Sequence, residues 1–173
     1  MTTVEYAGFA AVFSIGGRNY LNSVSDFEEL VAAVLRATGY HAKKTPDSHD
    51  RGIDLVAHPD SVGFESPYIK AQVKRQQSKV GSPEMQQFSG ALGNGERGLF
   101  VSTGGYTSGA KDAARNAEQR VTLINRHEFI GLLIQHYDDL ESEYQATVPL
   151  KQVYIPSQDP TRRVARESER ITD

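Results

Sequence analysis

The chain has 173 residues, a length that suits a single domain with one sizeable hydrophobic core. It contains no cysteine, which excludes disulfide bonds and thiolate metal sites. With 19 Lys and Arg against 22 Asp and Glu the net charge is -3, so any surface that binds phosphate groups must be local. Residues 1–20 carry no basic leader and no long apolar run, and we therefore expect a soluble, cytoplasmic protein with no membrane contact.

The first strong secondary-structure signal is a helix that begins near residue 25. Apolar residues recur there at helical spacing, Ser25 can cap the start, and Gly39 can end the helix. Before it, apolar residues on either side of Gly16-Gly17 predict a hairpin over residues 9–21. The apolar helix positions, which should pack on a core, are Phe27, Leu30, Val31, Val34 and Leu35.

Strands and further helices follow in an order typical of an α/β domain. Three strand-like segments favour an antiparallel meander, and two later buried strands separated by a helix favour parallel pairing. We therefore expect a central mixed sheet flanked by helices. The expected strands are residues 40–45, 53–58, 68–75, 98–103 and 121–125, and the expected later helices are a short one from Pro83, then residues 107–119 and 126–144.

The chain is expected to divide into three regions. Residues 1–24 form an N-terminal extension with the hairpin, and residues 25–144 form the folded domain. Residues 145–173 carry three of the seven prolines and end in a stretch rich in Arg, Glu and Ser. This composition predicts a tail that is extended or disordered unless a partner orders it.

Polar residues on two neighbouring strands are predicted to converge on one patch. Alternation along a strand sends Gln72 and Lys74 to the same face, with Val73 pointing into apolar packing. If the strand that starts at Ile53 pairs with the one that ends at Lys74, Asp54 stands beside them. An anion, a carbonyl oxygen and an ammonium suit phosphodiester hydrolysis, in which oxygen ligands hold Mg²⁺ and a cation orients or helps deprotonate water.

A second carboxylate is needed, because a Gln oxygen is uncharged and Asp54 and Gln72 alone would hold a divalent ion weakly. At about 100° per residue, Glu28 lies roughly 90° from the centre of the apolar helix stripe and Glu29 roughly 190°. Glu28 is therefore expected at the edge of the buried face and Glu29 in solvent. The pattern Ser25-x-x-Glu28 is also that of a capping box, in which the glutamate only returns to the Ser25 amide, and the local sequence favours neither interpretation.

Three blocks of the chain resemble a known family in order and spacing. The blocks are "FEELVAAVLRATGYHAKKTPDSHDRGIDLVA", "AQVKR" and "GLFVSTGGYTSGAKDAARNAEQRVTLINRHEFIGLL". They are similar to the catalytic domain of Mrr-type restriction endonucleases, a branch of the PD-(D/E)xK nuclease superfamily. The likeness runs from Phe27 to Leu133, well over half of the chain. It implies a restriction-endonuclease-like core within residues 25–144.

The family's motifs can be matched position by position. They are a Phe-Glu on the first helix, an Asp-x-Gly-x-Asp that enters the second strand, and a Gln-x-Lys on the third. A Gln where the superfamily has Glu is normal for this branch and does not imply an inactive enzyme. The matching positions here are Phe27-Glu28, Asp50 to Asp54, and Gln72-Val73-Lys74.

The resemblance implies a role for each of these residues. Asp54 and Glu28 would bind the metal, Gln72 would complete its site, and Lys74 would position the attacking water or stabilise the transition state. The metal would be Mg²⁺, with Mn²⁺ as a substitute, and the substrate would be DNA. Asp50 is a candidate accessory residue, although turn chemistry favours a loop residue that makes an Asx-type turn.

Basic residues gather around the third expected strand. Lys70, Arg75 and Lys79 are positioned to hold DNA phosphates near the metal, in a chain without net positive charge. The alternative is an ordinary solvated surface.

These observations predict a Mg²⁺-dependent DNA endonuclease that acts in restriction or defence. Cutting both strands of a duplex calls for two sites, so a homodimer is expected. No module that recognises the target is apparent in the sequence. Either another polypeptide supplies it, the N-terminal hairpin and the tail suffice, or this chain is the nuclease part of a larger protein. Two alternatives remain open: a structure-specific nuclease of the junction-resolvase kind, and a non-catalytic DNA-binding or assembly module that keeps the nuclease fold.

Overall fold

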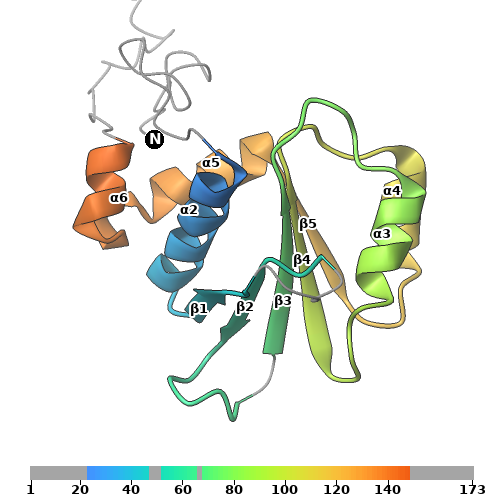
Figure 1. Cartoon of the computed structure of the whole chain (residues 1–173), viewed down its shortest axis with the longest axis horizontal. Coiled ribbons are helices and arrows are strands. Elements are labelled where there is room, and N and C mark those ends of the chain that lie inside the picture. Colours follow the sequence, from blue (N-terminus) through green and yellow to red (C-terminus); the bar gives the residue numbers. More distant parts are fainter. Residues whose placement is uncertain (1–22, 47–51, 66–67, 149–173) are drawn as a thin grey trace, which may run out of the picture. The chain divides into compact units, whose positions relative to one another are not determined.

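The computed structural model describes residues 23–46, 52–65 and 68–148, which belong to one compact unit, Tyr20–Val148. Its five-stranded sheet has helices on both faces (Figure 1). None of the helices in these ranges is long and apolar enough to cross a membrane. The strands, in sheet order, are β1 (His41–Lys44), β2 (Leu55–His58), β3 (Tyr68–Lys74), β4 (Glu96–Ser102) and β5 (Val121–Asn125). The helices are α2 (Val24–Ala37), α3 (Ser82–Ser89), α4 (Ser108–Arg115), α5 (Arg126–Gln135) and α6 (Ser142–Thr147), with a 3₁₀ turn η1 (Tyr137–Asp139).

The direction of strand pairing, antiparallel or parallel, depends on whether a loop or a helix connects the two strands. β1, β2 and β3 pair antiparallel, and β3, β4 and β5 pair parallel. Short loops join the first three strands, whereas α3 and α4 carry the chain back between the parallel ones. The predicted meander, the later parallel strands and the central mixed sheet flanked by helices are thus confirmed.

The first helix begins earlier than predicted, because its N-cap lies two residues before the predicted one. Ser23, not Ser25, is the N-cap of α2: the Asp26 amide donates to Ser23 Oγ at 3.0 Å, and the Ser23 amide donates to Asp26 Oδ2 at 2.8 Å. This reciprocal capping box leaves Glu28 outside the cap, so the capping interpretation of Glu28 is wrong. Gly39 follows the helix with φ +94°, as expected of a terminating glycine.

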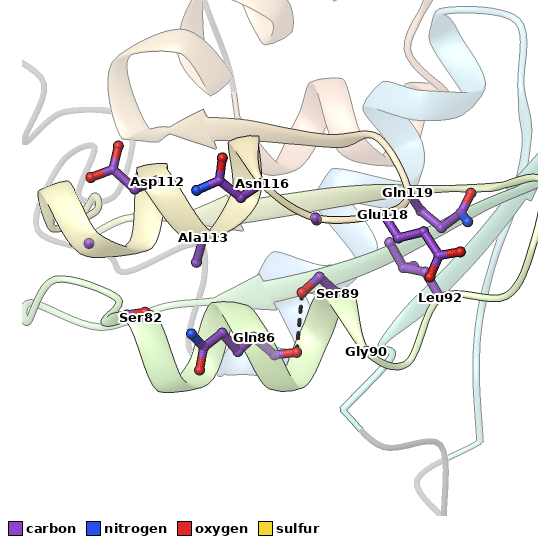
Figure 2. A pocket seen from close by; sticks show the side chains of 12 residues that line it. Ser82, Gln86, Ser89, Gly90, Leu92, Asp112, Ala113, Asn116, Glu118 and Gln119 are labelled. Carbon is purple, nitrogen blue, oxygen red and sulfur yellow. Dashed lines mark hydrogen bonds between the residues drawn. The ribbon is translucent and has the colours of Figure 1, made fainter.

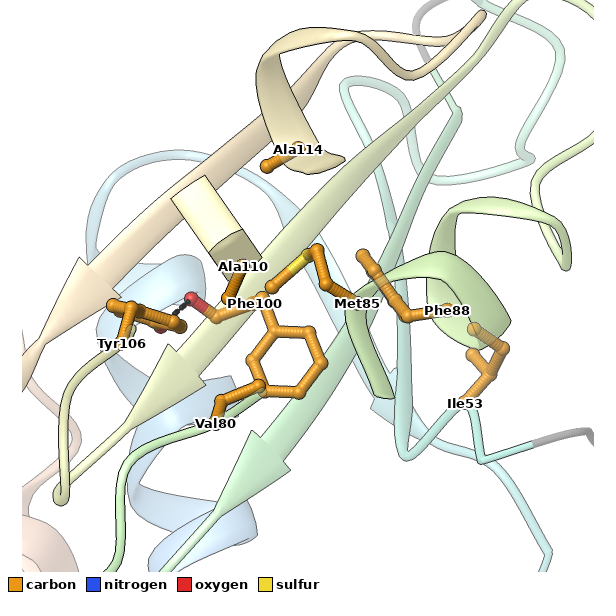
Figure 3. Packing of buried hydrophobic residues seen from close by; sticks show 8 residues of the cluster. All are labelled: Ile53, Val80, Met85, Phe88, Phe100, Tyr106, Ala110 and Ala114. Carbon is orange, nitrogen blue, oxygen red and sulfur yellow. Dashed lines mark hydrogen bonds between the residues drawn. The ribbon is translucent and has the colours of Figure 1, made fainter. Parts of the chain in front are cut away.

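The core packs on both faces of the sheet. On one face, α3 and α4 cover a cluster in which the Phe100 ring contacts Phe88 and Tyr106 edge-to-face, with centroids 5.1 and 6.0 Å apart (Figure 3). On the other face, Phe27 of α2 packs edge-to-face on Phe129 of α5 at 5.3 Å. Leu30, Val31 and Val34 are also buried, as predicted, while Leu35 is half-buried.

The helix predicted over residues 126–144 is broken into three pieces. α5 ends at Gln135, η1 follows, and Leu140 takes an extended conformation with ψ 146° and a buried side chain. α6 then lies back towards α2, where Arg36 Nε contacts Glu141 Oε1 at 2.6 Å. Tyr144 of α6 also reaches Glu29, which is half-buried rather than in solvent. A tertiary contact with α2 therefore overrides the local helical pattern.

The expected division into residues 1–24, 25–144 and 145–173 stays a prediction. The hairpin predicted over residues 9–21 lies outside the described residues, as does the chain beyond Val148. Within the described part, α6 extends to Thr147 and Val148 is fully buried.

The loop after β3 is fastened to the loop after β4. The Thr103 hydroxyl donates to the Gln76 carbonyl oxygen at 2.8 Å, and the Gln76 amide donates back to Thr103 Oγ1 at 2.9 Å. Gly104 lies directly against this loop, so that a Cβ at this position would overlap the Ser78 carbonyl oxygen. Only glycine allows the two backbones to approach so closely.

We predict that Gly104→Ala destabilises the fold by about 2–4 kcal/mol, because the added methyl group collides with backbone rather than with a movable side chain. The matched control is Gly109→Ala in α4, where the new Cβ would lie 3.5 Å from Ser82 Cβ. It should be neutral or stabilising by up to about 1 kcal/mol. Urea unfolding followed by circular dichroism measures both, and equal stability of the two variants would contradict the close packing of these loops.

Candidate active site

Three of the predicted site residues lie together where β2 begins and β3 ends. Gln72 and Lys74 belong to β3, and Asp54 directly precedes β2. The Asp54 amide donates to the Ala71 carbonyl oxygen at 2.9 Å, which places Asp54 beside the segment that carries Gln72. Glu28 projects from α2, and its charge, like that of Lys74, acts on the Asp54 carboxylate. The structure thus gathers the four residues at one end of the β2–β3 pair.

An irregularity in the β2–β3 pairing aims the Asp54 side chain. Leu55 lies opposite Ala71 in the register, and the Asp54 amide bonds to Ala71 as well, so two residues face one, as in a β-bulge. Asp54 Oδ2 accepts a hydrogen bond from the Val73 backbone amide at 2.7 Å. On the other side, the Thr45 amide donates to the Asp54 carbonyl oxygen at 2.9 Å. Neighbouring segments on both sides therefore hold Asp54.

The Asp54 carboxyl has a perturbed pKa. Burial raises the pKa above its ordinary value, and the nearby Glu28 carboxylate raises it further. The hydrogen bond from Val73 and the charges of Lys74 and Lys44 act in the opposite direction but do not cancel the shift. The folded protein therefore disfavours a negative charge on Asp54, which is the condition under which a cation at the site would be most stabilising.

Glu28 is held by a lysine from the first strand. Its Oε2 atom forms an ion pair with Lys44 Nζ at 2.9 Å, and the same ammonium donates to Ser25 Oγ at 2.7 Å. Only 15% of the Glu28 side chain and 23% of the Lys44 side chain are exposed, so the pair is largely withdrawn from solvent. Ser25, expected as the helix cap, thus serves as a partner for Lys44 instead.

Lys44 is the site residue that the sequence analysis missed. A usable signal exists, because Ala42 and Lys44 alternate onto the same side of β1 and Ala42 is buried. A lysine at the end of that row faces the helix rather than solvent. Its pairing with Glu28 nevertheless depends on how α2 packs against β1, which the local pattern does not encode.

Gln72 lies against the turn that leads into β2. Gly52 in this turn has φ +82°, and a Cβ there would lie 2.6 Å from Gln72 Nε2. Gly52 therefore meets two demands at once: a backbone conformation that side chains rarely adopt and close contact with the Gln72 amide. The Gln72 side chain is half-buried, so its position is restrained by the turn.

Lys74 ends the parallel ladder at the edge of the site. It lies in register with Ser102, and the Thr103 amide donates to the Lys74 carbonyl oxygen at 3.0 Å. The backbone of β3 is therefore paired with β4 up to Lys74, the last residue of the strand. The half-buried side chain brings its positive charge close enough to lower the pKa of Asp54 against the effect of burial.

The predicted DNA-binding residues occupy three different environments. Lys70 forms an ion pair with Glu96 at 2.8 Å, which neutralises part of its charge. Arg75 Nη1 donates to the Ser23 carbonyl oxygen at 3.3 Å and so connects the end of β3 to the start of α2. Lys79 is exposed in the loop that follows. Their contact with DNA stays a prediction.

Asp50, the candidate accessory residue, lies outside the described residues. Within residues 23–46, 52–65 and 68–148, no group of three or more His, Asp or Glu side chains is arranged to hold a metal ion. The candidate site there offers two carboxylates, from Glu28 and Asp54, together with the Gln72 amide oxygen.

A groove of about 630 Å³ lies elsewhere, between α3 and α4 (Figure 2). Small and polar residues line it, and the predicted site residues do not. The lining includes Ser82, Gln86, Ser89, Asp112, Asn116 and Glu118. This groove is therefore separate from the candidate active site.

The fold is that of the restriction endonucleases. The structure of MspJI restriction endonuclease in complex with a 27-mer oligonucleotide matches with a TM-score of 0.52 at 20% identity, over 86% of this chain and 36% of that one. The DNA modification-dependent restriction endonuclease AspBHI matches with a TM-score of 0.52 at 15% identity, over 86% of this chain and 43% of that one. The predicted restriction-endonuclease-like core is thereby confirmed.

Sequence similarity narrows the class to one family. The restriction endonuclease model Mrr_cat matches residues 22–133. Over 121 residues the chain is 38% identical to the type IV methyl-directed restriction enzyme EcoKMrr of Escherichia coli strain K12. That match covers 66% of this chain and 39% of the relative, so the chain spans well under half of the length of that enzyme. The chain belongs to the Mrr_cat family of restriction endonucleases, as the resemblance implied.

Asp54→Ala and Asp54→Asn should differ in stability. Alanine leaves the buried Val73 amide without its acceptor, whereas the asparagine oxygen can accept the same hydrogen bond. We expect Asp54→Ala to be less stable than Asp54→Asn by about 1–3 kcal/mol. Urea unfolding at neutral pH with EDTA present tests this, and equal stabilities would mean that the Val73 hydrogen bond contributes nothing.

The stability difference between wild type and Asp54→Asn should depend on pH. The pKa of Asp54 is higher in the folded state than in the unfolded state. The free energy of unfolding of the wild type therefore decreases as the pH rises from the unfolded-state pKa through the folded-state pKa, and Asp54 causes no further decrease above that pH. Asparagine does not titrate. In EDTA, the stability of Asp54→Asn relative to wild type should therefore increase across that range and then level off. A difference that fell with rising pH would contradict the raised pKa.

Proposed function

We propose that this protein hydrolyses DNA phosphodiester bonds in a reaction that depends on Mg²⁺, with Mn²⁺ as a substitute. The observation that carries the proposal is the grouping of Asp54, Glu28, Gln72 and Lys74 at one end of the β2–β3 pair. These are the positions at which the family pattern has its functional residues. The raised pKa of Asp54 supports it, since perturbed carboxyl groups cluster at functional sites.

The donor set suits a hard divalent cation. Asp54, Glu28 and Gln72 would hold it through oxygen atoms, the ligand type that Mg²⁺ prefers. Asp54 Oδ2 is engaged by Val73, but Oδ1 accepts no hydrogen bond from the residues that the structure describes. When bound, the ion would supply Lewis-acid stabilisation of the phosphate and a more acidic water.

The protein's own residues would orient the reacting groups. The hydrogen bond from Val73 keeps the Asp54 carboxylate at a fixed place beside β3, so little reorganisation would be needed when the substrate arrives. Lys74, at the end of β3 that pairs with β4, would offset charge on the phosphate and orient the attacking water. Gln72, restrained over Gly52, would complete the metal site from a restricted position.

Binding of the DNA backbone would use the basic residues around β3. Lys79 is exposed and Arg75 is partly exposed, so both can reach phosphates, whereas the Lys70 ammonium is shared with Glu96. We expect Lys79 and Arg75 to contribute more to affinity than Lys70, mainly through salt-sensitive phosphate contacts.

The biological role that fits best is restriction or another form of defence, in the cytoplasm. The relative EcoKMrr is a methyl-directed enzyme and AspBHI a modification-dependent one, which supports methylated DNA as the first substrate to test. A homodimer would supply the two sites needed for double-strand cleavage. Target recognition by a separate module or subunit is part of the proposal, and the family match covers residues 22–133.

The decisive experiment is cleavage of unmodified and methylated plasmid by the purified chain, with Mg²⁺ or EDTA. Wild type should cut only with metal. Lys74→Ala and Glu28→Gln should each lower the rate by at least about 100-fold, because the first removes the positive charge beside the reacting phosphate and the second removes an anionic ligand of the metal. Glu29→Gln, one residue from Glu28 on the same helix, should cut at close to the wild-type rate. Branched DNA substrates run alongside test the junction-resolvase alternative.

Cleavage that persists in EDTA or in Lys74→Ala would contradict the proposal. If folded, metal-supplied protein cuts none of these DNAs but binds them, the non-catalytic module becomes the better account.

A further inference from the structure

Lys44 makes contacts that set it apart from an ordinary surface lysine. Its Nζ atom lies 2.9 Å from Glu28 Oε2 and 2.7 Å from Ser25 Oγ, and its charge reaches Asp54. It therefore touches one of the two carboxylates proposed to hold the metal and acts electrostatically on the other. Lys43, the preceding residue, is exposed and lies on the other side of the same strand.

An ion pair between Glu28 and Lys44 and the binding of a metal ion by Glu28 oppose each other. A divalent cation bound through Glu28 would stand within a few ångströms of the ammonium, and like charges at such separations repel strongly in a half-buried setting. The lysine also supplies positive charge that the two carboxylates require when no metal is present. Without it, the Glu28 carboxylate would lose its ion-pair partner. Of the two lysines in the described part of the chain whose charges lower the pKa of Asp54, only Lys74 would be left.

We propose that Lys44 is a positioning residue that holds Glu28 in the metal-free protein and competes with the metal ion for it. Metal entry would displace the Lys44 ammonium from Glu28, while Ser25 Oγ offers it a remaining partner. Lys44 thus keeps the carboxylate in place between catalytic cycles and sets the metal concentration at which the site fills. This inference rests on the proposed function, because it takes Glu28 as a metal ligand.

The test is Mn²⁺ binding without DNA, measured from the electron paramagnetic resonance signal of the free ion. Lys44→Met should bind Mn²⁺ roughly 3- to 10-fold more tightly than wild type, because a competing positive charge is removed. Lys43→Met and Lys44→Arg should stay within twofold of wild type. Binding by Lys44→Met that equals or falls below wild type would overturn the inference.

Thermal stability separates this role from a purely structural one. Lys44→Met should melt below wild type in EDTA but gain more from saturating Mg²⁺, because a ligand that binds the folded state stabilises it in proportion to its affinity. A structural role alone predicts the same loss of melting temperature with and without Mg²⁺. That result would also count against the inference.

Asp54→Asn distinguishes failure of the inference from failure of the proposed function. If Asp54→Asn abolishes Mn²⁺ binding and Lys44→Met matches wild type, the metal site stands and the role of Lys44 falls. If wild type binds no Mn²⁺, or Asp54→Asn binds it unchanged, both proposals fall.

Should Lys44→Met not fold, wild type itself decides the matter. The lysines are labelled with ¹³C-methyl groups and observed by NMR, and the Lys44 resonance is assigned as the one that is missing from the spectrum of Lys44→Arg. This resonance should shift as Mg²⁺ is added. If it stays unchanged at saturating Mg²⁺, the inference is overturned.

Discussion

The hydrogen bond from the Val73 amide to the Asp54 carboxylate joins the sheet to the candidate site. β3 is the strand through which antiparallel and parallel halves of the sheet meet, so its amides must be paired along its whole length. At Val73 the partner is a side chain rather than a strand carbonyl. Because a side-chain oxygen accepts this hydrogen bond in place of a strand carbonyl, β2 can depart from regular pairing and a carboxylate is fixed within the sheet. Gln72 and Lys74 lie on either side of Val73 on the same strand.

Among the residues that the structure describes, the charges at the site occur in opposite pairs. Two carboxylates, Glu28 and Asp54, share their surroundings with two ammonium groups, Lys44 and Lys74. Such balance limits the desolvation cost of placing charges in a half-buried corner between a helix and two strands. It also means that the position of α2 matters for chemistry as well as for packing, because the same helix buries Phe27 and presents the next residue, Glu28, to the site.

Much of this arrangement could be predicted from local patterns, and the exceptions share one cause. Helical periodicity located α2, alternation located β2 and β3, and motif spacing predicted that Asp54, Gln72 and Lys74 lie close together. Ser23-x-x-Asp26 and Ser25-x-x-Glu28 both fit the spacing of a capping box. The structure forms the first through reciprocal hydrogen bonds between Ser23 and Asp26, whereas Ser25 and Glu28 contact Lys44. The break after α5 likewise depends on α6 reaching Arg36. Each failure involves residues far apart in sequence, whose packing no local pattern encodes.

Asp54 Oδ2 takes part in the hydrogen bonding of the sheet as well as in the candidate site, and this affects how related chains should be compared. A related chain without nuclease activity would still need an oxygen acceptor for the Val73 amide, so an acid or amide at position 54 would be expected there for reasons of strand pairing alone. Lys74 cannot replace Asp54 in this role, because the ammonium group of a lysine has no acceptor for a backbone amide. Among distant relatives, the lysine is therefore the more informative sign that the chemistry has been retained.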